Sequence, residues 1–195
     1  MNALPITGWA VLGLLSFGRE LSGYDLKKWA DQSMGFFYWS PSYSQIYSEL
    51  RRLESVGYAA SEEVPGDIRA KRLYRITPAG EDALREWAGT APVEPAVLKH
   101  GPMLRLWLGH LQDPARLRET LHAQRDLAEQ RRAQAAADVL AAEVNPEWIF
   151  PVMTLRWAEQ YYADERDRMD RMLADLDAVA KPTKTTKAAR ANGKG

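Results

Sequence analysis

The sequence predicts a mainly α fold of the α+β class, in which helices dominate and one two-stranded β-hairpin lies near residue 65. Apolar residues recur at helical spacing before residue 57, and again from about residue 97 to residue 178. Between these regions, two short segments with alternating side chains flank the turn-forming residues Pro65-Gly66-Asp67. We therefore expect a chain in two parts, with the hairpin in the first part.

Composition limits the class of protein before any motif is considered. A chain of 195 residues with 46% apolar and 27% charged side chains is typical of a globular protein with one medium domain or two small ones. The absence of cysteine excludes a disulfide framework, a thiolate zinc site and a cysteine nucleophile, and it fits a reducing cytoplasm. The apolar stretch Leu4–Phe17 is shorter than the ~20 residues that span a bilayer, and no positive charge precedes it. We expect a cytoplasmic protein that does not enter the membrane and in which this stretch is a buried helix.

The net charge is zero, but it divides unevenly among three predicted segments. Residues 1–90 carry −1, residues 91–178 carry −4 and residues 179–195 carry +5. The first segment is expected to be one domain and the second a helical domain, which begins with the Pro-bearing linker Thr90–Pro95. The third is basic and of low complexity, which predicts a disordered tail that either adds non-specific affinity for nucleic acid or only solubilises the chain. Global charge therefore neither favours nor excludes a nucleic-acid partner.

Capping signals divide the first segment into helices. Leu4–Leu15 is a continuous apolar helix, and Ser22 is a candidate N-cap of the second helix. Pro41 is predicted to be the first residue of a third helix, where its missing N–H does no harm. That helix is expected to run to Val56, with Gly57 as the left-handed residue that ends it.

A hairpin and a closing helix follow. Strands are predicted over Tyr58–Val64 and Arg69–Thr77, on either side of the turn. Thr77 is also expected to cap a helix that continues through Trp87, with Pro78 at its first position. Three helices, a two-stranded hairpin and a closing helix, in this order, predict a winged helix-turn-helix with the hairpin as its wing.

The third predicted helix has two contrasting faces when successive residues are placed about 100° apart. The core-facing sector is apolar, and Gln45 lies near its edge; its members are Ile46, Leu50, Leu53 and Val56. The outward sector is small and polar, with Ser44, Ser48, Arg51 and Ser55 flanked by Tyr47 and Arg52. Small hydroxyl side chains let a helix approach a duplex closely, and arginine can contact phosphate or guanine. An ordinary solvated face is the alternative, although serine lowers helix propensity without structural gain.

The N-terminal segment also resembles the PadR family of bacterial regulators, over roughly residues 5–90. The resemblance rests on four motifs: Leu12-Gly13-Leu14-Leu15, Gly23-Tyr24-Asp25-Leu26, the run from Phe37 to Gly57 around Ser42-Tyr43-Ser44-Gln45-Ile46-Tyr47-Ser48, and Leu73-Tyr74-Arg75-Ile76-Thr77-Pro78-Ala79-Gly80. The helical remainder is similar in pattern to the C-terminal domain of the virulence-activator-like branch of that family. The resemblance implies a homodimer that binds an inverted repeat, usually near its own promoter, and that a small aromatic molecule often releases.

The resemblance also implies which residues contact DNA. It points to Ser42, Ser44, Gln45 and Tyr47 in the third helix, and to Lys71 and Arg72 in the wing. Ser48 and Arg51 join this candidate set because they lie on the outward face. Arg69 adds a further positive charge close to the turn, whereas Glu62, Glu63 and Asp67 dilute the charge of the wing.

The second half of the chain is predicted to be helical throughout. Asp113 followed by Pro114 is expected to open a long helix to about Glu143. Asn145-Pro146 should start the next segment, in which Pro151 must begin a new helix or kink this one.

A repeat in the last predicted helix indicates packing against another helix. Tyr162, Met169 and Leu176 recur every seven residues, which is a seam suited to helix pairing. Both an intramolecular core and a homodimer explain such a seam, and the family resemblance favours the homodimer.

Aromatic side chains in the same half are candidates for a ligand site. Trp107, Met153 and Trp157, together with Trp148 and Phe150, could line a pocket for a planar aromatic molecule. The alternative is that these side chains only fill a core, which is the commoner role of tryptophan.

Enzymatic function finds no support in the sequence. His100, His110 and His122 are the only histidines, and their spacing makes no metal pair on one helix face. No phosphate-binding loop, nucleophile elbow or paired-carboxylate motif is present, so we expect no catalysis, no cofactor and no metal. The sequence predicts a sequence-specific DNA-binding transcriptional regulator, acting as a repressor. The alternative is a non-specific architectural or protein-binding winged helix.

Overall fold

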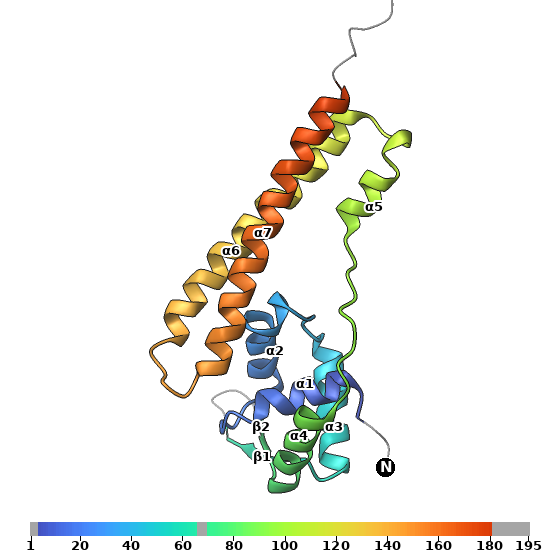
Figure 1. Ribbon diagram of the computed structural model, residues 1–195. Coiled ribbons are helices and arrows are strands. Elements are labelled where there is room, and N and C mark those ends of the chain that lie inside the picture. The colour runs from blue at the N-terminus through green and yellow to red at the C-terminus, as the bar shows by residue number, and fades with distance from the viewer. Residues whose placement is uncertain (1–3, 66–69, 181–195) are drawn as a thin grey trace, which may run out of the picture. The chain divides into compact units, whose positions relative to one another are not determined.

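The computed structural model describes residues 4–65 and 70–180 (Figure 1). It confirms the mainly α fold with a two-stranded hairpin, and the chain divides into two compact units, Met1–Ala96 and Val97–Gly195. The N-terminal unit contains α1 (Ile6–Leu15), α2 (Gly23–Gln32), the short 3-10 helix η1 (Met34–Phe36), α3 (Tyr43–Ser55), β1 (Ala59–Val64), β2 (Lys71–Ile76) and α4 (Pro78–Thr90).

The core of the N-terminal unit forms where α1, α2 and α3 meet. Each helix contributes side chains that are fully removed from solvent, and the largest of them are Leu12, Leu15, Leu26, Ile46, Leu50 and Leu53. The α1 helix is apolar on all sides because it also packs against α4, where the rings of Trp9 and Trp87 stack with centroids 5.3 Å apart. Burial of these side chains is the main source of stability for this unit.

Local hydrogen bonds fix where α2 begins and where α3 ends. The Ser22 hydroxyl accepts from the backbone N–H of Asp25, whose carboxylate accepts in turn from the Ser22 N–H, so the predicted N-cap is confirmed as a capping box. Gly57 has a φ of 78°, and its N–H donates to the carbonyl of Glu54 while the Tyr58 N–H donates to that of Leu53. This is the Schellman ending that the glycine predicts.

The predicted start of α3 is wrong by two residues. Ser42 is the N-cap, Tyr43 is the first helical residue, and Pro41 precedes the helix with its ring buried. Ser42 wins this position because its hydroxyl accepts from the Gln45 N–H at 3.3 Å, while Gln45 Oε1 accepts from the Ser42 N–H at 2.8 Å. Proline has no comparable side-chain acceptor to offer at the cap.

Val56 departs from the predicted two-faced pattern, and the structure also defines the positions of Glu49 and Gln45. Val56 is 46% exposed because α3 has already ended at Ser55, so its assignment to the core is wrong. Glu49 is buried, and a Cβ on Gly8 of α1 would lie only 3.1 Å from its carboxylate oxygen. Gln45, which the sequence places near the edge of the core-facing sector, is exposed to solvent.

The hairpin is antiparallel, with Ala59 opposite Ile76 and Val64 opposite Lys71. Its sheet is extended by Leu21, two residues before α2 begins, since the backbones of Leu21 and Tyr74 exchange two hydrogen bonds of 3.0 and 2.9 Å. The turn residues 66–69, which include Arg69, lie outside the described residues.

The closing helix α4 begins as predicted, with Thr77 as N-cap and Pro78 as first residue. Its first turn lies so close to the end of α3 that a Cβ on Gly80 would sit 2.2 Å from the carbonyl oxygen of Tyr58. Only glycine fits at this point.

The helical unit contains α5 (Gly101–Trp107), the 3-10 helix η2 (Gly109–Leu111), α6 (Pro114–Ala142) and α7 (Ile149–Ala180). Asp113 caps α6 as predicted. The next helix begins at Ile149 and not at Asn145, and Pro151 lies in its first turn, where proline is tolerated. The predicted basic tail from residue 181 onward lies outside the described residues.

The long helices α6 and α7 run side by side as a hairpin (Figure 1). Their shared seam is lined partly by small side chains such as Ala128, Ala135 and Ala158, which let the helices approach closely. Met169, at the centre of the seven-residue repeat, is 2% exposed within the single chain. The intramolecular alternative therefore accounts for this residue without a second protomer.

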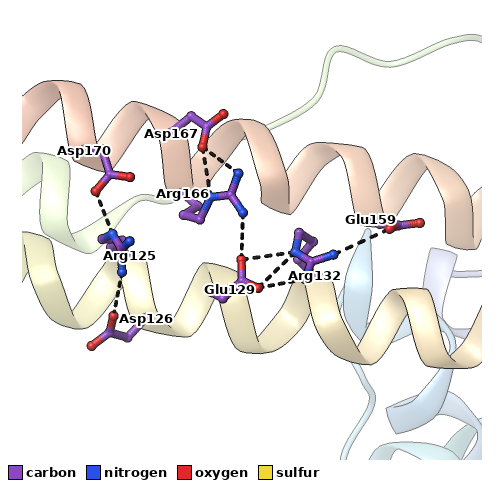
Figure 2. A network of polar contacts seen from close by, with 8 residues as sticks. All are labelled: Arg125, Asp126, Glu129, Arg132, Glu159, Arg166, Asp167 and Asp170. Atoms are coloured by element: carbon purple, nitrogen blue, oxygen red, sulfur yellow. Dashed lines mark hydrogen bonds and ion pairs between the residues drawn. The ribbon is translucent and has the colours of Figure 1, made fainter.

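Ion pairs set the register of the two helices (Figure 2). Glu129 of α6 accepts from Arg132 on its own helix and from Arg166 of α7, and these arginines lower the pKa of Glu129 to about 2. Arg125 pairs with Asp170 further along, at 2.6 Å. Such partly exposed pairs add little stability individually, but they disfavour sliding of one helix along the other.

A buried polar cluster attaches the start of α5 to this hairpin. His100 Nε2 lies 2.6 Å from Oε1 of Glu165, and Gln124 donates to the same oxygen at 3.2 Å. His100 Nδ1 accepts from the Met103 N–H and so caps α5. Burial by itself would raise the pKa of Glu165, but the hydrogen bonds from His100 and Gln124 outweigh it and lower that pKa.

Candidate DNA-binding surface

The outward face of α3 is small and polar, with arginine toward its C-terminal end. Ser44, Ser48 and Arg51 are exposed, whereas Ile46, Leu50 and Leu53 on the opposite side are fully buried. Since the core anchors one side of the helix completely, the other side can enter a groove without any rearrangement of the fold.

Ser42 and Gln45 are exposed, and they also form the capping box at the start of α3. The Ser42 hydroxyl lies 3.0 Å from the hydroxyl of Ser44 and accepts the capping hydrogen bond from the Gln45 N–H. The cap uses only the carbonyl oxygen of the Gln45 side chain, so its NH₂ group is not part of the cap. A contact from Gln45 to DNA would therefore be made by a donor whose position the cap already fixes.

Tyr47 is partly packed, and it lies against the first residue of α2. It is 41% exposed, and a Cβ on Gly23 would lie 2.6 Å from two of its ring carbons. Gly23 thus leaves the space that the Tyr47 ring occupies beside the start of α2. The contact restricts the Tyr47 side chain, which stays partly exposed.

Lys71 and Arg72, at the start of β2 in the wing, both have acidic partners. Lys71 Nζ lies 3.0 Å from the carboxylate of Asp25, and Arg72 lies 2.8 Å from that of Glu63. Hydrogen bonds from the Ser22 hydroxyl and then from Lys71 hold the pKa of Asp25 below its ordinary value. Both pairs are exposed, so each cation can exchange its carboxylate for a phosphate at small cost.

Arg51 and Arg52 are adjacent in sequence but differ in setting. Arg52 Nε lies 3.2 Å from the carboxylate of the buried Glu49, which ties it to the helix surface. Arg51 is exposed on the side of Ser44 and Ser48. The structure therefore favours Arg51 over Arg52 as the residue that reaches a base or phosphate.

Two exposed tyrosines beside this surface were not among the residues predicted from the sequence. Tyr24, in the first turn of α2, is 61% exposed, and Tyr43, the first residue of α3, is 46% exposed. Their rings stack with centroids 6.2 Å apart and an interplanar angle of 17°. Helical periodicity gave no signal for this pair, because it is the packing of two helices that brings the rings together.

The predicted ligand-binding residues of the helical unit are all largely exposed. Trp107 of α5 is 77% exposed, and Met153 and Trp157 of α7 are 59% and 51% exposed. Trp157 stacks on Tyr161, with ring centroids 5.2 Å apart. An enclosed site that involves these side chains would need a further surface to close it.

A shallow depression of about 370 Å³ on α6 and α7 has a polar lining of different residues, including Arg132, Arg156 and Arg166. Within residues 4–65 and 70–180, no group of three histidine or acidic side chains is placed to hold a metal ion. No helix in the same ranges is long and apolar enough to cross a membrane.

Comparison with known proteins identifies the N-terminal unit. Residues 11–86 match the model of the transcriptional regulator PadR-like family. The negative transcriptional regulator PadR of Bacillus subtilis is 35% identical over 105 residues, which are 53% of this chain and 57% of that protein. The match thus spans little more than half the length of this relative.

Solved structures extend the likeness over most of the chain. A PadR-like regulator from Bacillus cereus has a TM-score of 0.75 at 26% identity, and the virulence activator AphA of Vibrio cholerae has 0.65 at 26%; each comparison covers 89% of this chain and 99% of the other. Bacillus subtilis PadR has also been solved with operator DNA, with a TM-score of 0.76 at 22% identity over 89% of this chain and all of that one. Another structure of that protein contains p-coumaric acid. The matched segment contains the helix-turn-helix and the wing, so the N-terminal unit is similar to PadR-like transcriptional regulators, and the likeness in fold extends over most of the chain.

Proposed function

We propose that this protein is a sequence-specific DNA-binding regulator that places α3 in the major groove and the wing against the adjacent backbone. The observation that carries the proposal is the division of α3 into a fully buried apolar side and an exposed side that presents Ser44, Ser48 and Arg51. Ser42, Gln45 and Tyr47 extend the exposed side. Lys71 and Arg72 supply positive charge from the wing.

We further propose that the protein acts as a homodimer on an inverted repeat. A two-fold symmetric dimer presents two recognition helices, and a palindromic site mirrors that symmetry. The helical unit supports this with large apolar side chains that the single chain leaves exposed: Leu104, Trp107, Leu111, Leu127, Leu140, Val144, Ile149, Phe150, Met153 and Trp157. Exposed apolar residues in this number are typical of a surface that another protein covers.

We propose that the protein represses transcription, because the relative from Bacillus subtilis is a negative transcriptional regulator. Genome-wide recovery of bound DNA followed by footprinting tests both parts. We expect protected inverted repeats whose half-sites lie about 10 bp apart or a multiple of that, and higher transcription of the adjoining genes when this protein is deleted.

The alternative is a non-specific architectural protein. Such a protein would bind a protected sequence and a scrambled duplex with similar affinity, whereas a regulator prefers its site by about 10³-fold or more. Equal affinity for the two duplexes would overturn sequence-specific regulation and favour the alternative.

A small aromatic effector is the last part of the proposal. Bacillus subtilis PadR has been solved with p-coumaric acid, and in this chain Trp107, Met153 and Trp157 offer flat or adaptable apolar surface. If a planar acid binds there, it should quench tryptophan fluorescence and weaken DNA binding over the same concentration range, because coupling between the two ligands is reciprocal. Quenching without any change in DNA affinity would contradict the proposed switch.

A further inference from the structure

Three consecutive residues at the start of α2 each contact a different residue of the candidate DNA-binding surface. The contacts are made by Gly23 with Tyr47 of α3, by Tyr24 with Tyr43 of α3, and by Asp25 with Lys71 of the wing. The first turn of α2 is therefore the point at which the recognition helix and the wing are held together. The middle residue of the three is also the most exposed of the tyrosines on this surface.

The exposure of Tyr24 has no structural explanation within the unit. Tyr74 shows the contrast, since it is 4% exposed and belongs to the core, whereas Tyr24 leaves 61% of its surface in solvent. Stacking on Tyr43 restricts the ring to one orientation, so the hydroxyl would lose little conformational freedom on binding a partner. An exposed aromatic ring with a polar tip is suited to a surface where one end stays wet.

We propose that Tyr24 is a further DNA-contacting residue, whose hydroxyl donates a hydrogen bond to a backbone phosphate beside the groove that α3 enters, and that Tyr43 positions it. This inference rests on the proposed function. In helix-turn-helix proteins the helix before the recognition helix crosses the DNA backbone, and tyrosine hydroxyls are among the groups that contact phosphate.

The charges around Tyr24 are compatible with a phosphate partner. Asp25 is the nearest acid in sequence, and its carboxylate is paired with Lys71 at 3.0 Å and hydrogen-bonded to Ser22. When Lys71 turns to a phosphate, the hydrogen bonds from the Ser22 N–H and hydroxyl still hold the Asp25 carboxylate and offset part of its negative charge. Tyr24 belongs to α2 and not to the outward face of α3, so a contact with the backbone is favoured over a contact with a base edge.

The test measures DNA affinity of the full chain by fluorescence anisotropy, with a duplex that carries a footprinted site and with a scrambled duplex. Tyr24→Phe keeps the stacked ring and removes only the hydroxyl. We expect it to weaken binding to both duplexes by about tenfold, as the loss of a hydrogen bond to a charged group does. Because no charge is removed, the dependence of log affinity on log salt should keep its slope.

Three further variants separate contact from positioning. Tyr43→Ala should weaken binding by a similar factor, Tyr43→Phe should restore it, and Tyr43→Ala should add little in a chain that already carries Tyr24→Phe. Tyr161→Phe removes a hydroxyl from the helical unit and should bind as the unchanged protein does. Melting curves for every variant confirm that the folded fraction is the same.

Two results would overturn the inference. Unchanged affinity of Tyr24→Phe, while Arg51→Ala and Lys71→Ala weaken binding, would remove Tyr24 from the interface and leave the proposed function intact. A loss confined to the footprinted duplex would contradict a phosphate contact. If the unchanged protein binds neither duplex, the proposed function fails and the inference fails with it.

Discussion

Both units of the molecule expose large side chains, but the two sets differ in kind. In the N-terminal unit the exposed set is mostly aromatic, and most of its aromatic members belong to α2, α3 and the segment before α3: Tyr24, Phe37, Tyr38, Trp39, Tyr43 and Tyr47. In the helical unit it is mostly aliphatic, with Leu104, Leu111, Leu127, Leu140, Val144 and Ile149 among its members. Tyrosine suits a wet, charged partner, whereas aliphatic side chains suit a dry protein surface. The difference fits the partners that we propose for the two units, which are DNA for the N-terminal unit and a second protomer for the helical unit.

The largest expected effect tests whether the core of the N-terminal unit is complete without a partner. Leu53→Ala should lower the free energy of unfolding by about 2–5 kcal/mol, because it opens a cavity beneath α3. Ser48→Ala, on the outward face of the same helix, should change it by no more than about 0.5 kcal/mol. Denaturant unfolding measures both. Equal stability losses would contradict the assignment of the two faces.

The next prediction concerns the exposed apolar side chains of the helical unit. Leu104→Asp combined with Phe150→Asp should convert a dimer into a monomer at micromolar concentration, since buried charges oppose an apolar contact. DNA affinity should then fall by about 10² or more, because the two half-sites are no longer bound together. Sedimentation velocity measures the first effect and anisotropy the second.

A matched control for the dimer is Val93→Asp, which changes a valine that is 99% exposed in the segment after α4. It should leave the dimer intact. An unchanged protein that sediments as a monomer would refute the proposed homodimer directly.

Acid should weaken the cluster that holds α5 to the helical hairpin. The pKa of Glu165 is lowered from its ordinary 4.5 in the folded chain, so its stabilising effect is present above that pH and is lost as the pH falls through the folded value. Glu165→Gln should lower stability at pH 7 by roughly 1.5 kcal/mol. It should also flatten the loss of stability below pH 4.5, which thermal melts between pH 3 and pH 7 would show. Glu147→Gln removes an exposed carboxylate and should show the same dependence of melting temperature on pH as the unchanged protein. If Glu165→Gln showed that same dependence, a stabilising role of the Glu165 carboxylate would be excluded.

The smallest effect expected is on salt dependence. Lys71→Ala removes one phosphate-binding charge and should reduce the slope of log affinity against log salt by about one unit, on specific and scrambled duplexes alike. If the slope for Lys71→Ala equalled that of the unchanged protein, Lys71 would remain paired with Asp25 when DNA is bound.

Local signals in the sequence were sufficient to predict most of the fold. Ser22, Gly57 and Thr77 mark helix ends through hydrogen bonds within a few residues of themselves, and all three were predicted correctly. The start of α3 was not, because Pro41 and Ser42 both suit a helix start and only the hydrogen bonds of Ser42 with Gln45 decide between them. Neighbouring signals of the same kind cannot be ranked by sequence alone.

The candidate site was less predictable, because much of it depends on contacts between elements. The burial of Glu49 requires the space that Gly8 leaves in α1, and the position of Tyr24 requires the ring of Tyr43. Neither relation appears in the periodicity of one helix. The outward position of the serines and of Arg51 could be predicted from the sequence, because it follows from the helical periodicity of α3 alone.

The most direct test of the central proposal is the affinity of Arg51→Ala for a footprinted duplex and for its scrambled counterpart, measured beside a melting curve. Arg51 lies exposed on the outward side of α3, so its loss should leave stability within about 0.5 kcal/mol. Binding to the specific duplex should weaken by about 1–3 kcal/mol, and the preference over the scrambled duplex should shrink with it. Unchanged affinity and unchanged preference in a fully folded variant would contradict α3 as the element that reads DNA.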